Sequence, residues 1–86
     1  MLASQAAAHT IRLPRHKVGI IMDISNDGVF VHKTPPGCQL DIARGDIISH
    51  VNNVDVRDKS VQEIVHLFHR SIGSRNRSLT FTRGIQ

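Results

Sequence analysis

Tryptophan and tyrosine are absent from the sequence, and only three of its 86 residues are phenylalanine. The chain therefore has few aromatic side chains on which nucleic-acid bases stack, and its core must be mostly aliphatic. The single cysteine, Cys38, cannot form an internal disulfide, which favours a reducing compartment. No apolar run approaches the roughly 18 residues that span a membrane, and residues 1–8 lack the charged start and apolar centre of a secretion signal.

The sequence carries more basic than acidic side chains, with a formal net charge of +4. The basic residues are spread along the chain and no aromatic residues are interleaved with them. We therefore expect only weak, non-specific association with nucleic acid and weak contact with acidic membrane surfaces. The hydrophobic fraction of 40% predicts a folded chain. We place one small domain at residues 9–84, preceded by a flexible tail over residues 1–8.

Strand-like runs alternate with turn residues along most of the chain. The predicted strands are His9–Leu13, Ile20–Ile24, Val29–His32, Ile47–Val51, Val54–Val56 and Ser78–Thr82. Ser25–Gly28 and Asn52-Asn53 are typical of tight turns, and the prolines of Thr34–Gly37 end a strand. The first two strands are expected to pair directly as a hairpin, and Cys38–Ile42 is expected to be a short irregular or helical segment.

One longer helix is predicted over residues 60–70. Asp58 or Ser60 can cap its start near Val61, and Gly73 suits the position just past its end. The apolar side chains cover a broad arc of this helix, wider than one packing seam needs. Ile64 and Leu67 are expected to pack against a sheet. The remaining apolar residues would then overhang the neighbouring element, and they are Val61, Val65 and Phe68.

A basic loop leads directly into the second strand. Arg15, His16 and Lys17 precede Gly19, the residue that permits a backbone with N–H groups turned outward. Successive unpaired N–H groups form an anion-binding nest, which nearby cations reinforce. On this stretch alone a plain hairpin turn is the simpler interpretation. The overhanging helix edge beside an apolar strand favours a peptide-binding groove, because such a surface promotes aggregation unless a partner covers it.

Several motifs occur in a fixed order: Val18-Gly19-Ile20, Gly28–Val31 before Pro36-Gly37, Gly45–Ile48 before Val51-Asn52, and a helix before a last strand. Over roughly residues 9–83 this arrangement resembles a PDZ domain. The resemblance implies a mainly β fold with two helices, in which a partly open antiparallel barrel of five to six strands is capped by a short and a long helix. It also implies that a partner's C-terminal tail adds as a strand between the second strand and the main helix.

The resemblance also implies the binding residues. The family's Gly-Leu-Gly-Phe loop corresponds to Lys17-Val18-Gly19-Ile20, so lysine replaces the first glycine. The N–H groups of Val18, Gly19 and Ile20 would hold the terminal carboxylate. A nearby cation would assist them, with Arg15 as the first choice and Lys17 as the second. The pocket for an apolar last side chain would comprise Val18, Ile20, Met22 and Phe68. The other peptide-contacting residues would be Ile21, Asp23, Ile24, His32, Val61 and Val65.

Position 61 departs from the pattern of family members that prefer Ser or Thr two residues before the ligand's end. Those members carry histidine at the start of the helix, whereas this chain has Val61, with Val65 one turn later. A ligand hydroxyl would lose its water there without gaining a hydrogen bond, at a cost of about 1–3 kcal/mol. The resemblance therefore implies an apolar ligand residue at this place as well.

Other functions remain as alternatives. Glu63, His66 and His69 recur at helical spacing, but no cysteine or fourth ligand completes a metal site. Ser49 and His50 are adjacent on a strand, so they should point to opposite faces and not act as nucleophile and base. We therefore expect no enzyme and no cofactor. Related domains of bacterial periplasmic proteases regulate an attached protease, and the expected hairpin of the first two strands favours the intracellular scaffold type.

The expected partners are C-terminal peptides of other proteins, such as membrane receptors or signalling proteins. The domain is expected to be a monomer in isolation and to belong to a larger scaffold or signalling protein in the cytoplasm.

Overall fold

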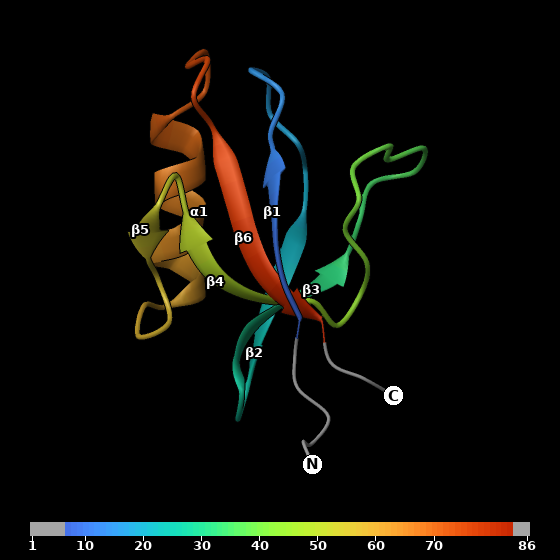
Figure 1. The fold of residues 1–86 in the computed structure, drawn as a ribbon, viewed down its shortest axis with the longest axis vertical. Coiled ribbons are helices and arrows are strands. Elements are labelled where there is room, and N and C mark those ends of the chain that lie inside the picture. The colour runs from blue at the N-terminus through green and yellow to red at the C-terminus, as the bar shows by residue number, and fades with distance from the viewer. Residues whose placement is uncertain (1–6, 84–86) are drawn as a thin grey trace.

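The computed structural model of the protein describes residues 7–83, which are mainly β, as the sequence predicts (Figure 1). Six strands and one helix follow in chain order. Their bounds are β1 Ala7–Arg12, β2 Ile21–Ser25, β3 Gly28–Lys33, β4 Ile47–Val51, β5 Val54–Asp55, α1 Val61–Arg70 and β6 Ser78–Arg83. Each predicted strand is present, with ends shifted by at most two residues. Ala7 and Ala8, which we assigned to the N-terminal tail, belong to β1.

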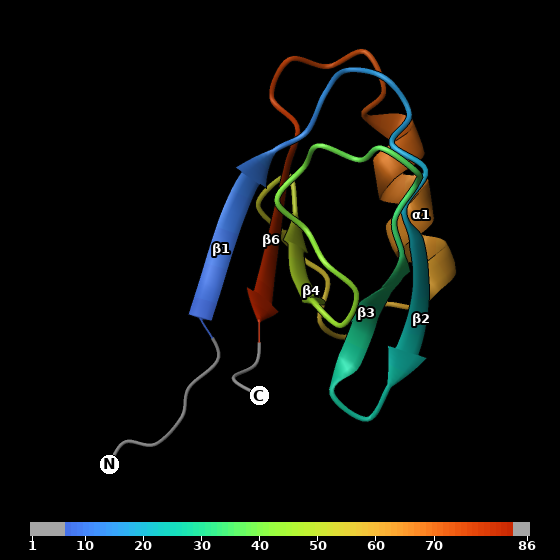
Figure 2. The same cartoon turned by 90° about the vertical axis from the view of Figure 1, so that its right-hand side faces the viewer.

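The strands form one antiparallel sheet in the order β1-β6-β4-β3-β2, and β5 pairs with β4 off this path. β1 and β2 lie at the two ends of the order, so the sheet is not closed. Figure 2 shows β1 beside β6, and the β2–β3 hairpin beside α1. A strand at a sheet edge carries backbone groups that no neighbour satisfies. β2 is such a strand, and it lies next to the helix.

The expected hairpin between the first two strands is wrong. β1 pairs with β6 along its whole length, from Ala7 opposite Arg83 to Arg12 opposite Ser78. Side chains reinforce this register: the ring of His9 stacks on Phe81 at 5.5 Å between centroids. The pairing continues past β1, because the N–H of Leu13 donates to the carbonyl of Arg77 at 2.9 Å. The following loop therefore crosses the fold before β2 begins. Because the hairpin is absent, it no longer favours the intracellular scaffold type over the type found in periplasmic proteases.

The short second helix is also absent, and residues 7–83 contain one helix, α1. Residues 38–46 form successive turns instead. The N–H of Cys38 donates to the carbonyl of Pro35 at 3.1 Å, and the N–H of Ala43 donates to the Asp46 carboxylate at 2.7 Å. The N–H of Gly45 donates to the Val31 carbonyl in β3 at 2.8 Å. Because these partners take the N–H groups that a helix would use, the segment stays irregular.

α1 begins with a capping box. The Ser60 hydroxyl accepts from the N–H of Glu63 at 3.2 Å, and the Glu63 carboxylate accepts from the N–H of Ser60 at 3.0 Å. Of the two caps that the sequence allowed, Ser60 is the one used. Hydrogen bonds from the backbone and then the side chain of Ser60 lower the pKa of Glu63. The helix starts at Val61 as predicted, so its apolar face has a fixed orientation.

The predicted division of that apolar face is wrong in one respect. Ile64 and Phe68 are the buried residues of α1, while Leu67 is only half-buried. Ile64 and Phe68 are four residues apart and share one stripe, which packs on the sheet. The core beneath them contains Leu13, Val29, Val31, Ile48, Val51, Val56, Leu79 and Phe81. Phe68 lies at the border of this core, where the helix meets the start of β2.

Candidate functional site

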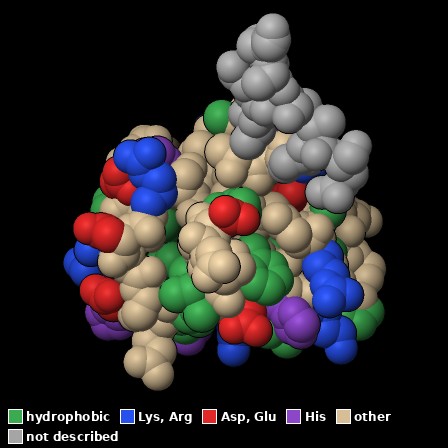
Figure 3. All heavy atoms as spheres, turned by 90° about the horizontal axis from the view of Figure 1, so that it is seen from below, with side chains coloured by type: hydrophobic (Ala, Val, Ile, Leu, Met, Phe, Trp, Pro, Cys, Tyr) green, Lys and Arg blue, Asp and Glu red, His purple; other side chains and the backbone are tan. Residues whose placement is uncertain are grey.

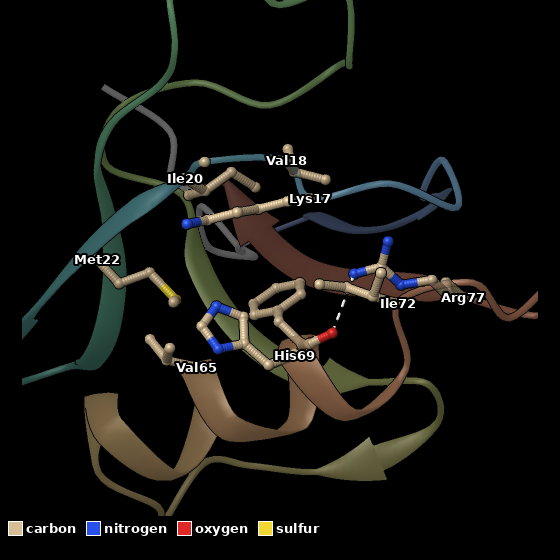
Figure 4. Close-up of a pocket in the computed structure, with 10 residues that line it drawn as sticks. Lys17, Val18, Ile20, Met22, Val65, His69, Ile72 and Arg77 are labelled. Atoms are coloured by element: carbon tan, nitrogen blue, oxygen red, sulfur yellow. Dashed lines mark hydrogen bonds between the residues drawn. The ribbon is translucent and has the colours of Figure 1, made fainter.

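A hollow of about 60 Å³ opens between the end of α1 and the loop that precedes β2. Its walls come from the loop, β2, the helix, Ile72 beyond the helix, and Arg77, which precedes β6. The lining residues are Lys17, Val18, Gly19, Ile20, Met22, Val65, Phe68, His69, Ile72 and Arg77 (Figure 4). The first seven are residues that the sequence analysis assigned to a peptide site. His69, Ile72 and Arg77 were not predicted.

The loop has the backbone geometry that the glycine suggested. Gly19 has φ +79°, a left-handed conformation that residues with a side chain rarely adopt. A Cβ at this position would lie 4.0 Å from the Cβ of Pro35, an ordinary contact, so the conformation rather than space requires glycine. The N–H groups of Val18, Gly19 and Ile20 have no acceptor among residues 7–83. Three successive free donors at the rim of a hollow are suited to binding an anion.

Much of the lining of the hollow is apolar. Met22 and Val65 approach each other from β2 and α1 (Figure 4), and Phe68 lines the same hollow. Ile72, just past the helix, is 46% exposed and closes one side. An apolar side chain that entered here would lose its water against four hydrophobic residues, which is favourable.

Other predicted residues lie outside the hollow. The Arg15 side chain donates to the carbonyl of Gly73 at 3.2 Å, and the N–H of Gly73 donates back to the Arg15 carbonyl at 2.7 Å. Arg15 therefore joins the loop to the exit of α1 and does not line the hollow. Val61 is half-buried in the first turn of α1, also outside the hollow. His32 is exposed on β3 and meets the ring of Phe30 edge-on at 6.3 Å.

The exposed residues of β2 continue away from the hollow along the sheet edge. Ile21 is 52% and Ile24 63% exposed, although both are large and apolar. Asp23, between them in sequence, accepts a hydrogen bond from the N–H of Ile24 at 2.8 Å. Apolar side chains on an edge strand are a risk for aggregation, so their exposure favours a partner that covers this edge.

Arg77 also lines the hollow, and the sequence did not single it out. It is 2% exposed, and its guanidinium donates to the carbonyls of Pro14, His16 and Phe68 and to the Ser71 hydroxyl. The signal was present in the alternation of β6, because Arg77 precedes the buried Leu79 and Phe81 at steps of two. The predicted strand begins at Ser78 and leaves Arg77 outside it, whereas this period places the Arg77 side chain on the inner face.

Ser49 and His50 are closer than expected. The register between β4 and β6 shifts between Ile48 and His50, and this irregularity brings His50 Nδ1 to 2.9 Å from Ser49 Oγ. The prediction that they point to opposite faces is therefore wrong. The Ser49 hydroxyl also donates to the Thr80 carbonyl at 3.2 Å.

The remaining alternatives gain no support from the described part of the chain. Glu63, His66 and His69 do not form a metal-binding group, and residues 7–83 contain no other group of three such ligands. No helix in this range is long and apolar enough to cross a membrane. Acidic and basic side chains are mixed around the hydrophobic ones on the face that Figure 3 shows.

The sequence matches no protein-family model, and a search of curated proteins finds no relative.

Proposed function

We propose that this domain is a PDZ-like interaction module that binds the C-terminal tails of other proteins. The tail would add as an antiparallel strand to the free edge of β2, beside α1. Its carboxylate would accept hydrogen bonds from the N–H groups of Val18, Gly19 and Ile20. The last side chain, which is apolar, would enter the hollow beside Met22 and Phe68.

The observation that carries this proposal is the position of the three free N–H groups. They lie at one end of an open sheet edge and at the rim of an apolar hollow. A chain terminus supplies both a carboxylate and an adjacent side chain, whereas an internal peptide segment supplies only the side chain. The combination of an anion site with an apolar pocket therefore favours a free C-terminus as ligand.

Further along the tail, the proposal assigns contacts to the exposed part of the groove. Ile21 and His32 would touch the intervening ligand residues, and Asp23 and Ile24 those farther from the terminus. Val61 and Val65 would contact an apolar residue two positions before the end. In this proposal the domain is a monomer in isolation, acts without catalysis, and belongs to a cytoplasmic scaffold or signalling protein.

The test is a comparison of peptides that differ only at their terminus. We expect a peptide ending in an apolar residue with a free carboxylate to bind at roughly micromolar strength, about −8 kcal/mol. Its C-terminal amide should bind far more weakly, because the anion is lost. Isothermal titration gives both affinities, and NMR should place the largest amide shifts at residues 18–20. Equal affinity for acid and amide would refute the proposal.

A further inference from the structure

Arg77 has an uncommon environment for a charged side chain. Its Nε donates to Ser71 Oγ at 3.0 Å, and its Nη1 donates to the carbonyls of Pro14 and His16, the second at 2.8 Å. Its Nη2 donates to the carbonyl of Phe68 at 3.2 Å. A guanidinium has five N–H donors, so these four bonds leave one N–H on Nη2. All four acceptors are neutral.

No carboxylate among residues 7–83 forms an ion pair with this charge. The seven Asp and Glu side chains of the sequence all lie within residues 7–83, and the ion pairs that they form involve Arg57 and Arg83. Burial lowers the pKa of Arg77, which is the direction expected for a cation removed from water. Arginine nevertheless stays protonated in proteins. Buried charges are normally paired, because the cost of removing an ion from water is large.

Part of the cost is offset locally. Phe68 and Ser71 lie at the carbonyl end of α1, where the helix dipole presents partial negative charge. Arg77 therefore also acts as a cap for this end of the helix. The partial charge of a helix terminus is about half an elementary charge, so much of the positive charge remains uncompensated.

The location of this charge is informative. Arg77 lines the same hollow as Gly19 and Phe68. Figure 4 shows its guanidinium between the loop that carries Lys17 and Val18 and the carbonyl end of α1. Through the carbonyls of Pro14 and His16 it also holds the segment that leads into the three free N–H groups. One buried cation thus both faces the hollow and positions its rim.

We infer that Arg77 is the residue that makes this hollow selective for an anion, its positive charge being balanced by the ligand's terminal carboxylate. This inference rests on the proposed function and adds the source of the selectivity. The sequence favours Arg15 or Lys17 for assisting the carboxylate, but both of these residues are exposed. Solvent weakens the attraction of an exposed cation, whereas a buried one acts through a less polar medium.

The test measures the ratio of affinities for the acid and the amide of one peptide. In Arg77→Met we expect this ratio to fall by roughly tenfold or more, as when one member of a buried charge pair is removed. Arg77→Lys cannot reach all four acceptors, but it keeps the positive charge. Because the charge is kept, the ratio of affinities should stay within about threefold of that of the unaltered domain. Arg75→Met is the matched control, because Arg75 is exposed in the same loop and its loss changes net charge equally.

Stability separates the structural role from the selective one. Both Arg77 variants lose capping bonds and should unfold at lower temperature, but only Arg77→Met should lose the ratio. An unchanged ratio in folded Arg77→Met would overturn the inference while leaving the proposed function intact. Equal binding of acid and amide by the unaltered domain would overturn both.

If Arg77→Met does not fold, a second measurement tests whether Arg77 responds to the ligand's carboxylate. In the unaltered domain, the NMR signal of the Arg77 Nε–H should be visible because that group is buried and hydrogen-bonded. Titration with the acid peptide should shift this signal, and titration with the amide should shift it much less. Equal shifts with both peptides would show that Arg77 does not respond to the carboxylate, and would overturn the inference.

Discussion

Two arginines lie at opposite ends of β6 and have opposite kinds of partner. Arg83, the last residue of the strand, donates from Nε and Nη2 to the two carboxylate oxygens of Asp46 at 2.9 and 2.8 Å. Arg77, just before the strand, donates only to carbonyls and a hydroxyl. Their pKa values move accordingly. The hydrogen bonds to Asp46 raise the pKa of Arg83, and burial lowers that of Arg77.

The difference separates a structural end of the sheet from an open one. At the Arg83 end, Asp46 is 1% exposed and its charge is balanced by a forked ion pair. At the Arg77 end, a buried cation, three free N–H groups and an apolar hollow occur together. The first end needs no further partner, and the second provides what an anionic, partly apolar ligand requires. We expect substitutions at the first to change stability and substitutions at the second to change binding.

The largest loss of unfolding free energy is expected for Asp46→Asn. Breaking a buried ion pair costs about 3–5 kcal/mol, and partial exposure of Arg83 should reduce this to about 2–3 kcal/mol. The side chain of Arg83 is 37% exposed, so water can hydrate the charge that is left. Chemical denaturation measures the loss of unfolding free energy. Asp41→Asn is the control, because Asp41 is exposed and 3.7 Å from Arg83, and it should cost little.

The same pair predicts how stability depends on pH. Burial raises the pKa of Asp46, but hydrogen bonds from Arg83 and from the N–H of Ala43 outweigh it and leave the pKa lowered. A carboxyl with a lowered pKa in the folded state stabilises the fold above its unfolded pKa of about 3.9, and this stabilisation is lost as pH falls through the folded pKa. Below pH 4 the unaltered domain should therefore lose more stability than Asp46→Asn. Parallel pH profiles of the two proteins would contradict this account.

Two glycines with positive φ, one at each end of the sheet, test the comparison between the Arg77 end and the Arg83 end. Gly19 borders the hollow and has φ +79°, while Gly45 adjoins Asp46 and has φ +96°. Alanine at either position should destabilise the fold by about 1–2 kcal/mol, because a Cβ is disfavoured at positive φ. Only Gly19→Ala should weaken the C-terminal peptide, by roughly tenfold, since a changed backbone would turn the free N–H groups away. Thermal unfolding and peptide titration of both variants separate the two effects.

The sequence predicted the local elements because their signals are local. Asn52 and Asn53 do adopt positive φ values of 52° and 68°, as the choice of two asparagines for a tight turn indicated. The capping box likewise depends on residues three apart, Ser60 and Glu63. The loop with Gly19 was identified by the same kind of short-range argument. The other predicted lining residues, such as Met22 and Phe68, followed from the resemblance in the order of the motifs and not from a local signal.

Long-range partners could not be predicted in this way. The ion pair between Asp46 and Arg83 joins residues 37 positions apart, and the pairing of β1 with β6 joins the two ends of the described chain. Alternation shows which face of a strand is buried but not which strand lies beside it. Arg77 was missed for a related reason: a charged residue is expected at the surface unless its partners are known. Two of its acceptors, Pro14 and His16, lie 63 and 61 positions away, and the other two lie at the end of α1.

The smallest effect is expected at Val61, at the start of the helix that flanks the open end. Val61 and Val65 are one turn apart and both half-buried, so in the proposed function they form an apolar wall beside the bound peptide. Val61→His would supply a ring nitrogen and shorten this wall. The preference for an apolar residue over Thr, two positions before the ligand's end, should then fall by about fivefold, close to 1 kcal/mol. Titration of both peptides against both proteins gives this value as a double-mutant cycle, in which general damage cancels.

The control for this substitution is Val54→His, because Val54 is 43% exposed on β5 and away from the hollow. It introduces the same ring without altering the wall, so its ratio of affinities should equal that of the unaltered domain. A preference for Thr in the unaltered domain, or a ratio that Val61→His leaves unchanged, would mean that Val61 does not contact the ligand. The peptide would then follow β2 without reaching the first turn of α1, and specificity at the open end would depend on the hollow and Arg77 alone.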